Sequence, residues 1–157
     1  MVRIKMHAAL KKIMTQTKKQ RAICLIMFIL YILTVLYLTI FRFNFRYSER
    51  KLNLTLFVSL IQVFRNADLG EFLRLFFGNI GWFVPFGFLL PILLKRNNSL
   101  IIIGNGLLLS IFIEVIQFVS YKGVAELDDL ILNTLGAAIG YLLYWFALRS
   151  SSTGARV

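Results

Sequence analysis

The chain has 157 residues, of which 59% are hydrophobic and only 16% charged, and its formal net charge at pH 7 is +11. Soluble domains are typically about 45–50% apolar and about 25% charged, so a soluble protein of this length could not bury so much apolar surface. The composition therefore predicts a membrane protein. The basic residues flank apolar runs and no nucleic-acid fold signature is present, so we do not expect nucleic-acid binding.

Cysteine and histidine are too scarce for the commonest metal and redox sites. Cys24 is the single cysteine and His7 the single histidine. An intramolecular disulfide and a zinc site built from cysteines are therefore excluded, and a histidine cluster is not expected. We expect no cofactor and no bound metal ion.

The N-terminal segment, residues 1–21, contains seven lysines and arginines and no acid. It fits either a basic amphipathic helix at an anionic membrane surface or a cytoplasmic tail that sets the orientation of the protein. Residues 22–41 then carry no charge over 20 positions. This length suffices to cross the hydrocarbon core, so we expect a permanent transmembrane helix rather than a cleaved signal peptide.

The middle of the chain alternates short and long apolar stretches. Those within residues 52–77 are too short to span a bilayer and predict interfacial or re-entrant helical pieces. The second span is predicted at residues 78–94, where Pro85 and Pro91 favour a kink, or a broken helix that exposes backbone groups. The third and fourth spans are predicted at residues 100–120 and 129–148.

We therefore expect an all-α, polytopic membrane helix bundle with about four transmembrane helices. Residues 22–148 would form the transmembrane domain, and residues 149–157 a disordered cytoplasmic tail. With both termini in the cytoplasm, the inner side of the cell membrane holds 11 of the 18 basic residues and none of the seven acids. This asymmetry follows the positive-inside rule.

The predicted third span has a small and polar face. Spacings of four, four, three and four residues place its members on one side of a helix. They are Gly106, Ser110, Glu114, Gln117 and Tyr121.

The predicted fourth span has a similar face, formed by Asp129, Asn133, Gly136 and Gly140, in which the glycines allow close helix approach. Asn79 lies at the same predicted depth in the second span. We infer a contact of three helices with a polar cluster at its outer end. The predicted members are Asn79, Glu114, Gln117, Asp128, Asp129 and Asn133.

Two interpretations of this cluster remain open. An ionised acid at the centre of a transmembrane helix costs about 2.5–3.5 kcal/mol, and Glu114 can offset a smaller cost by hydrogen bonding or protonation. The cluster then either stabilises the bundle through hydrogen bonds between helices, or forms a site for a ligand, an ion or a proton. Asp128 and Asp129 fit helix capping as well, and Lys122 is a nearby basic partner.

These residues resemble the pattern of the VanZ-like family of bacterial membrane proteins. The resemblance extends over roughly residues 25–148. Near Asn53 and Phe57 it includes a short Asn-Leu element with Leu56 in place of a proline, and Gly123 occupies a position where many members carry arginine. The matching residues in the spans are Asn79, Phe83, Pro85, Gly87, Glu114, Gln117, Asp128, Asp129, Asn133, Thr134 and Gly136.

The resemblance implies a cell-envelope protein that lowers susceptibility to the glycopeptide teicoplanin, with no established mechanism. Our first hypothesis is non-enzymatic: an outward-facing polar pocket binds an envelope component, such as a cell-wall precursor, or the lipoglycopeptide drug. One alternative is an integral membrane enzyme acting on a lipid-linked substrate, in which Glu114 with Asp128 or Asp129 holds a divalent cation or provides acid–base catalysis. Another is a structural scaffold subunit. The oligomeric state is left open.

Overall fold

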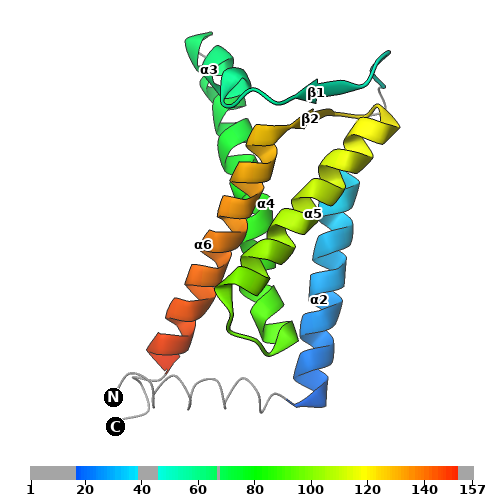
Figure 1. The fold of residues 1–157 in the computed structure, drawn as a ribbon. Coiled ribbons are helices and arrows are strands. Elements are labelled where there is room, and N and C mark those ends of the chain that lie inside the picture. The colour runs from blue at the N-terminus through cyan, green and yellow to red at the C-terminus, as the bar shows by residue number, and fades with distance from the viewer. Residues whose placement is uncertain (1–16, 39–45, 67, 152–157) are drawn as a thin grey trace.

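The computed structural model describes residues 17–38, 46–66 and 68–151 (Figure 1). Within this part of the chain, four helices are long and apolar enough to cross a membrane. The predicted all-α bundle is therefore confirmed. Residues 1–16 of the predicted N-terminal segment 1–21, residues 152–157 of the predicted C-terminal tail 149–157, and the end of the first predicted span beyond residue 38 lie outside the described residues. The four helices are α2 (Lys18–Leu36), α4 (Leu69–Leu94), α5 (Ser99–Ser120) and α6 (Leu127–Ser151).

Helix α4 begins earlier than the sequence predicted. It runs without interruption through Pro85 and Pro91, so residues 69–77 form its first turns instead of a separate interfacial piece. The Asp68 carboxylate caps the helix by accepting a hydrogen bond from the Glu71 amide at 2.9 Å. A capped start with an acid in the first turn stabilises a helix ahead of its apolar run. The alternative of a broken second span is wrong.

Two short strands and a short helix gather at one end of the bundle, which we call the strand end (Figure 1). Strands β1 (Lys51–Asn53) and β2 (Val124–Glu126) pair in parallel, with Leu52 opposite Ala125. Helix α3 (Val58–Arg65) exposes Ile61 and Phe64, as an interfacial helix would. The start of α2 and the end of α6 lie at the opposite end, called here the terminal end.

Helices α4 and α6 make the most extensive contact in the bundle. Three glycines allow it, because a Cβ atom at any of them would overlap backbone of the facing helix. Gly87 lies against the Ala137 carbonyl, Gly136 against the Ile80 carbonyl and Gly140 against the Val84 carbonyl. Close packing of small residues is a common way to hold membrane helices together. This contact fixes the depth at which the polar residues of α4 and α6 face each other.

Candidate functional site

A largely enclosed cavity of about 40 Å³ lies between α4, α5 and α6 toward the strand end. Each water molecule needs about 10–15 Å³, so the cavity has room for only a few water-sized groups. Five of the six residues predicted for the polar cluster line it, and Phe83 contributes to its apolar wall. The lining residues are Asn79, Trp82, Phe83, Ile113, Glu114, Gln117, Asp129 and Asn133.

Glu114 is placed by the sharp turn that follows α5. The helix ends at Tyr121, whose φ of 60° lies in the left-handed region, and β2 then runs back beside the helix. The Glu126 amide consequently donates a hydrogen bond to Glu114 Oε2 at 3.0 Å. Gly123 suits this turn, because a Cβ there would lie 3.1 Å from the Gln117 side chain. Glu114 is only 6% exposed.

The other cluster members connect the helices in pairs. Asn79 Nδ2 of α4 donates a hydrogen bond to Asp129 Oδ1 of α6. Asn133 Nδ2 of α6 donates to Ser110 Oγ of α5 at 2.9 Å, and both side chains are buried. Ser110 was not among the predicted site residues, although its position one turn before Glu114 on the polar face of the third span was a usable signal.

Asp128 lies outside the cavity, which corrects its predicted place in the cluster. Both oxygens of its carboxylate accept a bifurcated hydrogen bond from the single Phe57 backbone N–H, at 2.8 and 2.9 Å, and Asp128 is buried. Phe57 has a φ of 58°, an uncommon conformation for a large residue that surrounding contacts must hold. Asp128 therefore anchors the loop that leads into α3. The backbone N–H that Asp128 binds lies 71 positions earlier in the chain.

The cavity offers acceptors from two carboxyl groups, and its three side-chain amides can both donate and accept hydrogen bonds. Glu114 and Asp129 both contribute carboxylates, and within residues 17–38, 46–66 and 68–151 neither forms an ion pair. The same part of the chain holds no group of three or more His, Cys, Asp or Glu side chains arranged to bind a metal ion. The arrangement suits a small donor such as an ammonium group, a hydroxyl group or water.

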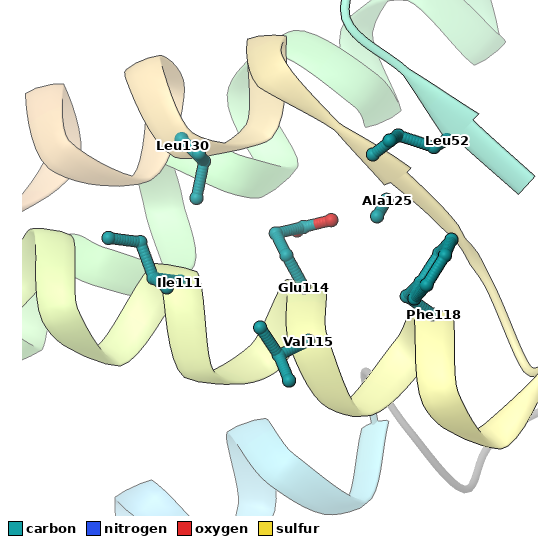
Figure 2. Close-up of a pocket in the computed structure, with 7 residues that line it drawn as sticks. All are labelled: Leu52, Ile111, Glu114, Val115, Phe118, Ala125 and Leu130. Carbon is teal, nitrogen blue, oxygen red and sulfur yellow. The ribbon is translucent and has the colours of Figure 1, made fainter.

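Glu114 also borders a second, larger space. An apolar groove of about 300 Å³ lies between α5, the start of α6 and the two strands, and the Glu114 side chain stands in its wall (Figure 2). This groove was not predicted from the sequence, because it depends on β1 joining the bundle. Its lining residues are Leu52, Ile111, Glu114, Val115, Phe118, Ala125 and Leu130.

Comparison with known proteins decides the family. The family model described as VanZ/LLP1 matches residues 28–148, which include both faces of the polar cavity. The chain belongs to the VanZ/LLP1 family. Protein VanZ of Enterococcus faecium is 34% identical to it over 121 residues, covering 73% of this chain and 69% of that protein. No solved structure matches the chain. The resemblance inferred from the polar motifs is thus confirmed, and the protein is an integral membrane member of the VanZ/LLP1 family.

Proposed function

We propose that this VanZ/LLP1-family protein lowers the susceptibility of a cell to teicoplanin by binding an envelope component, or the drug itself, at the outer surface of the cell membrane. The observation that carries the proposal is the meeting of two carboxylates, Glu114 and Asp129, with three amide side chains around one cavity. Acids within membrane helices are expensive to maintain and commonly mark functional sites.

The proposal requires the strand end to face the outside, with both termini in the cytoplasm. Charge supports this orientation. The described residues of the terminal end include six lysines and arginines and no acid, whereas all seven acids lie toward the strand end. Positive residues are retained on the cytoplasmic side of a membrane. The six basic residues are Lys18, Lys19, Arg21, Lys95, Arg96 and Arg149.

The size of the cavity limits what it binds. A space of about 40 Å³ cannot enclose a glycopeptide or a cell-wall precursor. We propose that one donor group of the ligand, an ammonium or hydroxyl, enters between Glu114 and Asp129 while the rest of the molecule lies against the strand end. Charge-assisted hydrogen bonds to two carboxylates favour such a donor over an apolar group of similar size.

Expression in a teicoplanin-sensitive host tests this function. Cells with verified membrane insertion of the chain are compared with empty-vector cells for their susceptibility to teicoplanin and to vancomycin. We expect a higher inhibitory concentration of teicoplanin in the expressing cells. Unchanged susceptibility to both drugs, at a level of inserted protein that immunoblotting confirms, would contradict the proposal.

A further inference from the structure

The apolar groove beside Glu114 is open toward the surroundings of the bundle rather than enclosed. Three of its lining residues are strongly exposed although they are aliphatic: Leu52, Ile111 and Val115, the last of them 53% exposed. Its volume of about 300 Å³ is at the lower end of the range for ligand pockets. Within a bilayer, a concave apolar surface of this kind fits a hydrocarbon chain.

One cationic side chain lies beside the groove. The Arg50 guanidinium lies 5.6 Å from the centroid of the Phe118 ring, which lines the groove, and 5.2 Å from that of Tyr121. Aromatic faces hold a guanidinium in place while leaving its N–H donors available. The two segments that contain the strands, residues 46–53 and 121–126, carry four basic and two acidic side chains. They are Arg46, Arg50, Lys51 and Lys122, and Glu49 and Glu126.

We propose that this groove binds an anionic phospholipid, with one acyl chain along Ile111 and Val115 and the phosphate at Arg50. The acyl chain satisfies the apolar wall, and the planar guanidinium matches phosphate oxygens. A zwitterionic lipid offers the same chain but no net negative charge to Arg50. Glu114 is the only residue that lines both the groove and the polar cavity. Its Oε2 atom accepts a hydrogen bond from the Glu126 backbone amide. The site therefore stands independently of the drug-related proposal.

The test uses the full chain purified in detergent and titrated with phosphatidylglycerol or phosphatidylcholine of identical acyl chains, with bound lipid measured by native mass spectrometry. We expect phosphatidylglycerol to bind about fivefold more tightly, the factor given by about 1 kcal/mol for one basic residue at an anionic surface. Equal binding of the two lipids to the wild-type protein would overturn the proposal.

Two pairs of variants locate the site. Arg50→Gln should remove the preference for phosphatidylglycerol, whereas Arg65→Gln, which removes an equal charge on α3, should retain it. Val115→Trp should fill the groove and weaken binding of both lipids. Val119→Trp is the matched control, because Val119 is one turn further along α5, is 56% exposed and does not line the groove. Circular dichroism and elution volume verify folding of each variant.

Each opposite outcome contradicts the proposal. Lipid preference that survives Arg50→Gln would exclude Arg50 as the phosphate partner. Lipid binding that survives Val115→Trp would exclude the groove, and if that variant also changed the oligomeric state, the groove would be an interface with a second copy. Should Val115→Trp fail to fold, Val115→Cys in a Cys24→Ala background provides the measurement. Its thiol labelling should slow with phosphatidylglycerol and not with phosphatidylcholine, and equal labelling with both lipids would reject the site.

Discussion

Glu114 is the residue at which the polar cavity, the apolar groove and β2 meet. One carboxylate oxygen accepts the Glu126 amide, and the side chain borders both spaces. The residue therefore has a structural task, holding β2 against α5, and a proposed binding task. The structural task needs only an acceptor atom, whereas the binding task needs the charge. Substitutions of different chemistry can therefore separate the two.

Replacing Glu114 tests this division through stability. Glu114→Gln retains an oxygen that accepts the Glu126 amide, so we expect little loss of stability. Glu114→Ala leaves that part-buried amide without its acceptor, which should lower the free energy of unfolding by about 1–3 kcal/mol. Denaturant titration of the detergent-solubilised protein, followed by circular dichroism, measures both. Equal losses of unfolding free energy in the two variants would show that the hydrogen bond from β2 to residue 114 does not stabilise the protein.

Asp128 should matter for the loop before α3 rather than for the cavity. Asp128→Ala removes the bifurcated hydrogen bond from the Phe57 backbone N–H, and we expect a loss of about 1–3 kcal/mol in the free energy of unfolding with faster proteolysis between residues 54 and 66. Asp68→Ala is the control, since it removes only the cap of α4 at a cost of about 1 kcal/mol. Unchanged protease resistance of this loop in Asp128→Ala would refute the anchoring role.

At the scale of residues, the helical period was sufficient to predict part of the candidate site from the sequence. Spacings of three and four placed Glu114 with Gln117 and Asp129 with Asn133, and these residues do line one cavity. The position of Asp128 could not be predicted from helical spacing. Adjacent helical residues point in directions about 100° apart, and the partner of Asp128 is the amide of Phe57, whose proximity depends on the tertiary fold.

At the scale of elements, the contact between α4 and α6 sets the geometry of the site. Predicting α4 from hydropathy alone missed its first turns, because residues 69–77 contain Glu71 and Arg74 and so interrupt the apolar pattern. In the structure these two side chains form an ion pair on the helix surface. The β1–β2 pair was also missed, since three-residue strands carry almost no periodic signal and their pairing joins segments far apart in sequence.

Glycine substitutions test the contact between these helices. Gly87→Ala and Gly140→Ala should each place a methyl group into the facing backbone and destabilise the protein by about 1–3 kcal/mol. Gly81→Ala, in the same helix as Gly87, meets no atom within 4 Å. It should be neutral or stabilise by about 0.5–1 kcal/mol, because alanine favours a helix interior. Thermal unfolding in detergent gives the ranking, and similar losses at Gly81 and Gly87 would argue against close packing at Gly87.

At the scale of the whole molecule, the separation of charge between the two ends underlies the proposed orientation. Cysteine labelling in a Cys24→Ala background tests it. Ser48→Cys, near the strand end, should react with a membrane-impermeant thiol reagent in intact cells. Ser150→Cys, at the terminal end, should react only after permeabilisation. The reverse pattern would place the polar cavity on the cytoplasmic side and remove the basis for its binding an extracellular ligand.

The carboxyl groups within the cavity are central to the proposed binding, and the drug susceptibility of cells that express conservative variants tests their role. Glu114→Gln and Asp129→Asn retain the hydrogen-bond acceptors that join the helices, so both should insert at wild-type abundance and yet fail to lower teicoplanin susceptibility. Asp68 is an acid at the same end of the bundle but outside the cavity. The control variant Asp68→Asn should therefore lower teicoplanin susceptibility as the wild type does. Full protection by Glu114→Gln and Asp129→Asn at equal abundance would contradict the proposed binding role of the two carboxyl groups. The cluster would then serve only to connect the helices through hydrogen bonds.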